Sequence, residues 1–178
     1  MSAEQLVGVT ALMLAAKYEE IYPPEVRDYV YICDNAYTRE QIVQMEQLIL
    51  SKLNFRLTVP TQRSYLKRFC KAAQGDARHL MLTSYLMELT LVDAGALAFR
   101  PSELCAAATH LALRMTGLPP WSPTLAKYTR FLAADLDAAA RYIEGLHRRA
   151  ADPAAAQKAA HKKYASTRFH AVSALPMP

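Results

Sequence analysis

Cysteine and glycine are scarce in this sequence. Its 178 residues include three cysteines, at positions 33, 70 and 105, and five glycines. Three widely separated cysteines cannot all pair and show no Cys-x-x-Cys spacing, so neither a disulfide framework nor a zinc ribbon is expected. The glycines form no Gly-x-Gly-x-x-Gly or Gly-x-x-x-x-Gly-Lys loop, which excludes the common phosphate-binding motifs.

Long apolar runs and catalytic motifs are also lacking. The longest nearly apolar run, residues 6–16, has 11 residues, whereas a membrane helix needs about 20. The residues after Met1 lack the basic start of a signal peptide, so we expect an intracellular protein with no membrane partner. No His-Glu-x-x-His or Gly-x-Ser-x-Gly motif occurs. We therefore expect no metal site, no cofactor and no enzymatic activity.

Two reactive side chains, Cys105 and His110, fall within an apolar stretch. His110 is expected to be a hydrogen-bonded core histidine rather than a metal ligand. Cys105 is expected to pack as a small hydrophobic residue, because an activated thiolate would need basic neighbours.

The formal charge of +5 is unevenly distributed along the chain. Residues 1–51 carry a net charge of −5, residues 52–78 carry +6, residues 79–140 carry −1, and residues 141–178 carry +5. A uniformly basic chain would point to a nucleic-acid partner. This chain is instead a charge mosaic, so charge alone does not favour such a partner.

Almost every stretch of the chain predicts α-helix, since strict alternation and hairpin turn signals are missing. Residues 6–16 are apolar all round, which predicts a helix buried on every side. Thr38 and Gln41 form a capping box, Ser122 and Asp135 are candidate caps, and Gly117 ends a helix. The predicted helices cover about 6–16, 39–53, 61–73, 77–92, 101–115, 123–131, 135–150 and 154–164. The final residues are expected to be loose.

An internal repeat predicts two similar helical units. Nearly all-apolar helices begin at Gln5 and Glu103, 98 residues apart, and proline pairs follow at 23–24 and 119–120, 96 residues apart. We expect each unit to be built around one buried central helix.

Two long strings of residues carry a family resemblance. They are LVGVTALMLAAKYEEIYPPEV, residues 6–26, and DYVYICDNAYTREQIVQMEQLILSKLNFRL, residues 28–57. Together they resemble the second half of the first cyclin box of a mitotic cyclin. A weaker resemblance continues beyond Pro60 through the second box, where FRPS at 99–102 and KYAS at 163–166 fit the B-type branch best.

The resemblance implies an all-α cyclin fold of tandem helical boxes. Residues 1–57 would be the C-terminal part of the first box, residues 58–150 the second box, and residues 151–178 a C-terminal helix and tail. The chain would bind and allosterically activate a cyclin-dependent protein kinase of the mitotic type at the G2/M transition, in the nucleus and cytoplasm.

The resemblance also implies which residues would bind the kinase. Lys17 matches the family's lysine that hydrogen-bonds the kinase, and Glu46 matches its partner glutamate. Five positions match apolar residues that frame the interface: Tyr18, Ile21, Leu50, Phe55 and Leu57. Without the resemblance, Lys17 would simply stabilise a helix C-terminus, Glu46 would be a solvated helix residue, and the apolar residues would pack in a core.

This sequence departs from the family at its start, because the resemblance begins at the third helix of the first box. The Met-Arg-Ala-Ile-Leu motif of the substrate-docking patch is absent, so docking of substrates through that patch is not expected. We expect a fragment or truncated product, or a box that something else completes. A helix that is apolar on all faces and lacks neighbours would invite aggregation or a compensating partner.

Two other functions stay open at this point. The chain could be a nucleic-acid-binding module of the TFIIB type, which uses the same helical repeat, because residues 52–78 and 141–178 are basic. It could also be an inactive truncated cyclin that activates no kinase.

Overall fold

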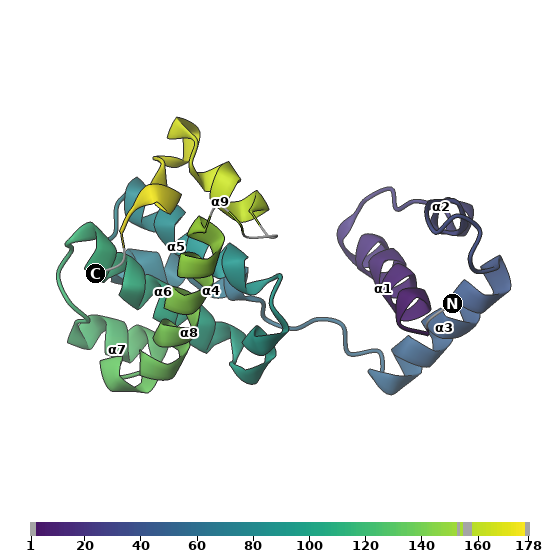
Figure 1. Ribbon diagram of the computed structural model, residues 1–178. Helices are drawn as coiled ribbons and strands as arrows, with labels where there is room; N and C mark the ends of the chain where they lie inside the picture. Colours follow the sequence, from purple (N-terminus) through teal and green to yellow (C-terminus); the bar gives the residue numbers. More distant parts are fainter. Residues whose placement is uncertain (1–2, 153, 155–157, 177–178) are drawn as a thin grey trace. The chain divides into compact units, whose positions relative to one another are not determined.

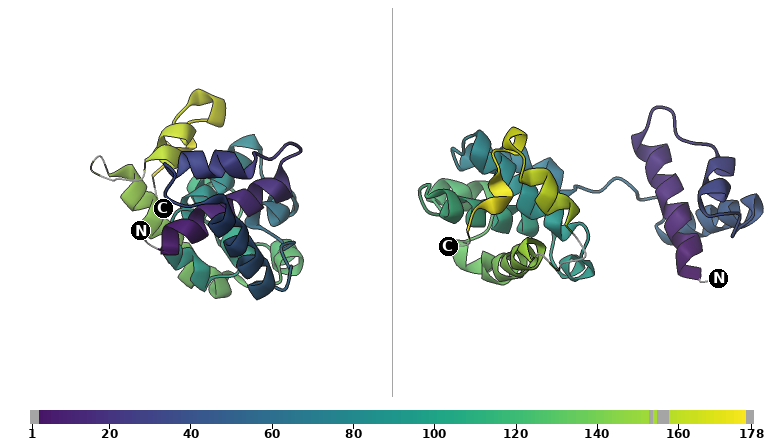
Figure 2. Two further views of the ribbon diagram at one scale, coloured as in Figure 1. Left: turned by 90° about the vertical axis from the view of Figure 1, so that its right-hand side faces the viewer. Right: turned by 45° about the horizontal axis from the view of Figure 1, so that its top comes forward.

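Figure 1 shows the computed structural model, which describes residues 3–152, 154 and 158–176. Helices and the loops that join them make up the described residues, which contain no β-strand, as both views of Figure 2 also show. The expected all-α fold is confirmed. The chain divides into two compact units, Met1–Val59 and Pro60–Pro178.

The described residues of the first unit form three helices, α1 (Ala3–Glu19), α2 (Val26–Ile32) and α3 (Arg39–Lys52). The predicted capping box starts α3. Thr38 Oγ1 accepts from the Gln41 backbone N–H at 3.3 Å, and Gln41 Oε1 accepts from the Thr38 N–H at 2.8 Å. A small core joins the three helices, and its buried members are Met13, Ala16, Tyr29, Tyr37 and Ile42.

Residues 6–16 form a helix as predicted, but the prediction that this helix is buried on every side is wrong. The segment lies within α1, which packs against α2 and α3 on one side and buries Thr10 and Met13 completely. Side chains on its other side are exposed, Val7 by 43% and Leu12 by 55%. Two partner helices cannot cover a helix that is apolar all round.

The second unit is larger and has a fuller core. It contains α4 (Gln62–Ala72), α5 (Ala77–Thr90), α6 (Pro101–Thr116), α7 (Pro123–Thr129), α8 (Asp137–Ala151) and α9 (Ala159–Tyr164), with short 3₁₀ turns between some of them and after α9. Helix α6 is the buried centre and packs against α4, α5 and α8, so the expected buried central helix is found in this unit. Gly117, at φ +66°, ends α6 as predicted.

The observed bounds of α3, α4, α5 and α6 lie within two residues of the predicted ones. Ser122 caps α7 as expected by accepting from the Leu125 N–H, although α7 ends at Thr129. Asp135 does not cap α8. Its Oδ2 accepts from the Leu132 N–H at 2.7 Å, which stabilises the preceding 3₁₀ turn, Ala133–Leu136.

The last helix is shorter than predicted, and the residues that follow it are better packed than predicted. Ala154 lies in a turn and α9 begins only at Ala159, while residues 155–157 lie outside the described residues. Helix propensity alone is a weak guide for so short a segment. The expectation of loose final residues is wrong for Val172 and Ser173, which are buried because they pack against α5 and α9.

Cys70 and Cys105 are both buried in the second core, and Cys105 is a packed hydrophobic residue as predicted. Burial raises the pKa of the Cys70 thiol to about 11 and that of Cys105 to about 12.

His110 is partly buried and packs edge-on to the Trp121 ring. Its Nδ1 has no hydrogen-bond partner, so the expectation of a hydrogen-bonded histidine is wrong for that atom. Trp121 instead donates to the Phe131 carbonyl oxygen.

The stability of the second unit is expected to fall as the pH drops below about 6.5. Burial lowers the pKa of His79 and of His147, because the interior disfavours imidazolium, and His147 Nδ1 shares a 3.0 Å hydrogen bond with the Tyr85 hydroxyl. Below about pH 6.5 the unfolded chain therefore binds more protons than the folded one, and the free energy of unfolding decreases.

Urea unfolding followed by the fluorescence of Trp121, the sole tryptophan, measures this change at pH 7.5 and pH 5.5. The control replaces the exposed His170 with Gln, which removes a surface histidine and leaves the buried ones in place. An unfolding free energy that is the same at both pH values would contradict the prediction.

Candidate functional site

An ion pair joins α1 and α3 in the first unit. Lys17 lies in the last turn of α1, where a cation also interacts favourably with the helix dipole. Its Nζ is 2.6 Å from Glu46 Oε1 on α3. The Lys17 side chain is 42% exposed and that of Glu46 is 15% exposed. The structure therefore brings together the two residues that the resemblance paired.

Lys17 keeps donor capacity in this arrangement. An ammonium group has three N–H donors, and the contact with Glu46 uses one of them. A partly exposed pair of this kind contributes only about 0–1 kcal/mol to stability. Its clearer effect is to hold the Lys17 ammonium at a defined place on the surface while leaving it accessible.

The next residue along α1, Tyr18, is tied to the end of the first unit. Its hydroxyl lies 2.6 Å from Thr58 Oγ1, and the Tyr18 side chain remains 50% exposed. Sequence reasoning did not single out Thr58. A hydroxyl residue two positions before Pro60 gives no pattern that would have marked it as part of a site.

Phe55 is presented by the turn that ends α3. The Phe55 N–H donates to the Leu50 carbonyl oxygen and the Asn54 N–H donates to that of Ser51, which is the Schellman pattern. Asn54 and Phe55 both have positive φ, 48° and 55°, which is unusual for a bulky side chain. The Phe55 side chain is 71% exposed. An exposed aromatic residue on a strained backbone suggests a functional role.

Packing in a core does not explain most of the predicted apolar positions. Ile21 is 87% exposed, and Tyr18 and Phe55 are also exposed, whereas Leu50 and Leu57 are partly buried. Exposed apolar side chains on a unit that also carries a charged anchor are typical of a protein-binding surface. We call Lys17, Tyr18, Ile21, Glu46, Leu50, Phe55 and Leu57 the anchor surface.

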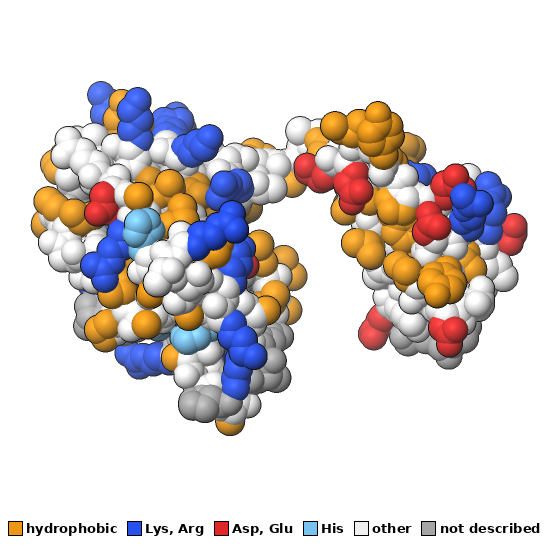
Figure 3. Space-filling view, turned by 90° about the horizontal axis from the view of Figure 1, so that it is seen from above, with side chains coloured by type: hydrophobic (Ala, Val, Ile, Leu, Met, Phe, Trp, Pro, Cys, Tyr) orange, Lys and Arg blue, Asp and Glu red, His pale blue; other side chains and the backbone are white. Residues whose placement is uncertain are grey.

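The two units differ in the charge that they expose. On the face seen in Figure 3, Asp and Glu side chains lie among hydrophobic side chains on the first unit, whereas Lys and Arg predominate on the second. This agrees with the formal net charges of the two units, −3 for residues 1–59 and +8 for residues 60–178.

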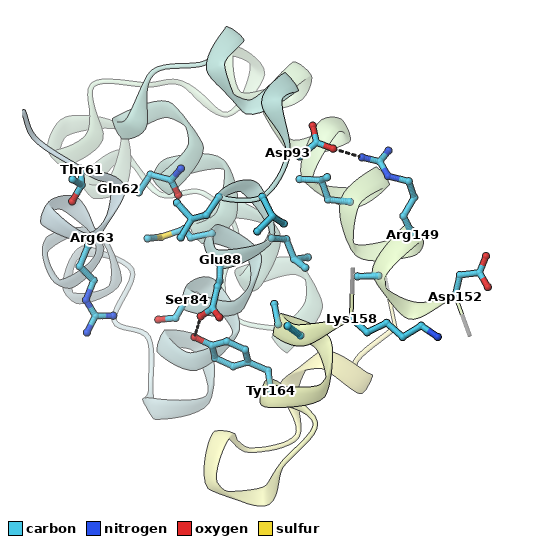
Figure 4. Close-up of a pocket in the computed structure, with 18 of the residues that line it drawn as sticks. Thr61, Gln62, Arg63, Ser84, Glu88, Asp93, Arg149, Asp152, Lys158 and Tyr164 are labelled. Atoms are coloured by element: carbon cyan, nitrogen blue, oxygen red, sulfur yellow. Dashed lines mark hydrogen bonds and ion pairs between the residues drawn. The ribbon is translucent and has the colours of Figure 1, made fainter. Parts of the chain in front are cut away.

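The second unit has a cavity of about 1210 Å³ that sequence reasoning did not predict. Apolar side chains of α5 and α8 line much of it, including Met87, Leu89 and Leu146. Figure 4 shows two of its polar contacts, from the Tyr164 hydroxyl to Glu88 at 3.1 Å and from Arg149 to Asp93 at 3.0 Å. These polar groups satisfy one another, which favours a structural role for them.

The described part of the chain contains neither a cluster of metal ligands nor a membrane-spanning helix. No group of three or more His, Cys, Asp or Glu side chains there could hold a metal ion. None of the helices described is both long enough and apolar enough to cross a membrane.

The fold defines a class, that of all-helical proteins made of two successive helical units. The model of the cyclin C-terminal domain matches residues 60–178, and that of the cyclin N-terminal domain matches residues 1–58. The chain belongs to the cyclin family. The resemblance to this family that residues 6–57 carry is thereby confirmed.

The chain is similar to B-type cyclins in particular. It is 44% identical to G2/mitotic-specific cyclin-B2 of Rana japonica over 97% of this chain and 44% of that protein. It is 42% identical to G2/mitotic-specific cyclin-B of Spisula solidissima over 96% of this chain and 40% of that protein. The chain thus spans less than half the length of these relatives.

A solved structure supports the fold. The viral cyclin from herpesvirus saimiri matches with a TM-score of 0.64 over 80% of this chain and 64% of that chain. At 16% sequence identity, this likeness concerns the fold alone.

Proposed function

We propose that this chain is a regulatory subunit, not itself an enzyme, that binds and activates a cyclin-dependent protein kinase of the mitotic type. It would act at the G2/M transition, in the nucleus and cytoplasm. The similarity to G2/mitotic-specific cyclins supports the cell-cycle role. The anchor surface supports the mode of binding.

The observation that carries the proposal is the Lys17–Glu46 pair on a unit that also exposes the apolar side chains of residues 18, 21 and 55. Stable interfaces combine apolar anchors with a few polar groups that become desolvated in the complex. Glu46 fixes the position of Lys17, which has N–H donors left for a carbonyl or carboxylate oxygen of the kinase. Tyr18, Ile21 and Phe55 offer apolar area that would otherwise remain in water.

Activation follows from selective binding. An active protein kinase needs an ion pair between the glutamate of its regulatory helix and a lysine of its β-sheet. A subunit that binds the kinase more tightly with this helix in the active position shifts the population toward that state. The chain supplies no catalytic group in this scheme. Its contribution is the difference in affinity between the two kinase conformations.

Binding of nucleic acid is the second candidate, because Arg63, Lys67 and Lys71 are exposed at four-residue spacing along α4. Such a basic stripe on one helix face is what contacts to phosphates require. The similarity to B-type cyclins weighs against this candidate. The third candidate is a truncated cyclin that activates no kinase.

Size-exclusion chromatography of the purified chain with a purified mitotic cyclin-dependent kinase tests the proposal. We expect a one-to-one complex and a higher rate of peptide phosphorylation than the kinase shows alone. A folded chain that forms no complex would contradict the proposal. Salt-sensitive retention of duplex DNA without kinase binding would support the second candidate, and a complex without activation would support the third.

A further inference from the structure

We propose that Tyr22 is a phosphorylation site for a tyrosine-directed protein kinase, and that a phosphate there weakens binding of the cyclin-dependent kinase. The second half rests on the function proposed above, whereas the first half does not. The proposal concerns the segment between α1 and α2, in which Tyr22 directly precedes Pro23.

Tyr22 is the most accessible tyrosine in the first unit. Its side chain is 89% exposed and its backbone lies outside any helix. The residue before a proline is biased toward extended backbone. An extended, protruding segment lets the hydroxyl enter a kinase cleft without unfolding the chain.

The other four tyrosines of this unit are worse acceptors. Tyr29 and Tyr37 are buried. Tyr31 is 79% exposed but lies within α2. The hydrogen bonds of this helix keep the Tyr31 backbone from becoming extended. Tyr18 lies in the last turn of α1, and its hydroxyl is engaged with Thr58.

The charges around Tyr22 define the kind of kinase that would accept it. Glu19 and Glu20 precede the tyrosine and are both exposed, and the exposed Glu25, which pairs with Arg27, follows Pro24. This acidic segment complements a basic peptide groove, because opposite potentials steer association and fix register. A kinase with an acidic groove would be repelled.

The transfer itself uses groups that are free to react. The Tyr22 hydroxyl oxygen would form a bond to the γ-phosphorus of MgATP as the bond to ADP breaks. The hydroxyl proton would pass to the catalytic aspartate of the acting kinase. Neither Tyr22 nor its neighbour Ile21 belongs to a packed core, so the product phosphate meets no steric obstacle in the first unit.

The product would change the anchor surface. A phosphate adds about −1.5 to −2 charges at neutral pH. It would lie one residue from Ile21 and two from Glu20, in a segment that is already acidic. It would place a strongly hydrated group beside the apolar residues that the cyclin-dependent kinase would cover, and desolvating a charge without a partner opposes association.

The acceptor half is tested with the purified chain, MgATP and a purified tyrosine kinase domain whose peptide groove is basic. We expect one phosphate by intact mass, assigned to Tyr22 by fragmentation of the peptide that follows Lys17. Tyr22→Phe should lose this phosphate, and the matched control Tyr31→Phe should keep it. Phosphate found on Tyr18 or Tyr31 instead of Tyr22, or no phosphate at all, would overturn the proposal.

The regulatory half compares the affinity of phosphorylated and unphosphorylated chain for the cyclin-dependent kinase. We expect phosphorylation to weaken binding by at least about tenfold, since uncompensated charge at an interface costs more than 1.4 kcal/mol. Kinase-treated Tyr22→Phe should bind like untreated chain. Equal affinities would overturn this half. If the unphosphorylated chain binds no kinase, the proposed function fails, and the phosphorylation of Tyr22 is still decided by its own assay.

Discussion

Replacing Leu111 with alanine is expected to lower the free energy of unfolding of the second unit by about 2–5 kcal/mol. Leu111 is fully buried on α6, the helix that packs against α4, α5 and α8. The substitution removes buried apolar atoms and leaves a cavity that rigid neighbours cannot fill. Since domains of this size are stable by only about 5–15 kcal/mol, the loss is a large part of the total.

Trp121 fluorescence during urea unfolding measures this change, because the sole tryptophan lies in the second unit. The matched control is Leu97→Ala. It removes the same atoms from a side chain that is 88% exposed, and should change the unfolding free energy by less than about 0.5 kcal/mol. Similar losses for the two variants would show that α6 is not the centre of the core.

Replacing both Lys17 and Glu46 with alanine is expected to weaken binding of the cyclin-dependent kinase by about 2 kcal/mol or more, roughly 30-fold. The pair lies 2.6 Å apart and positions the Lys17 donors on the surface. A single substitution would leave one charge without its partner, and the resulting disturbance of the fold could be mistaken for lost binding. Removing both charges avoids this. Titration calorimetry with the purified kinase measures the change.

Arg27→Ala provides the matched control for charge. Arg27 forms an ion pair with Glu25 in the same unit, at 3.0 Å, and both side chains are well exposed. Its loss should change affinity by less than about threefold, as is usual for a charge at the rim of an interface. The helical circular dichroism of both variants should match that of the original chain. Unchanged affinity of the Lys17/Glu46 double variant would show that the pair is not an anchor.

The sequence predicts the ends of helices well where contacts between residues close together in the chain determine them. Thr38 with Gln41, Ser122 with Pro123, and Gly117 each control one helix end through contacts with residues a few positions away. The pairing of Lys17 with Glu46 was also predictable, but only through the family resemblance. The spacing of 29 residues between them has no local meaning.

Features that depend on tertiary packing could not be predicted in this way. The burial of Val172 near the end of the chain comes from contacts with distant helices. Asp135 has the right side chain for the start of α8, yet it stabilises the turn before that helix. The apolar pattern of α1 shows that its faces can be buried, whereas which of them are covered depends on its neighbours.

The placement of the three cysteines makes the chain selective toward thiol reagents. Cys70 and Cys105 stay protonated at neutral pH, because burial raises the pKa of both thiols to about 11 and about 12. Cys33, in the first unit, is only partly buried. A maleimide fluorophore should therefore attach to Cys33 in the folded chain, with no cysteine having to be removed. A single dye on the unit that carries the anchor surface would then report kinase binding there directly.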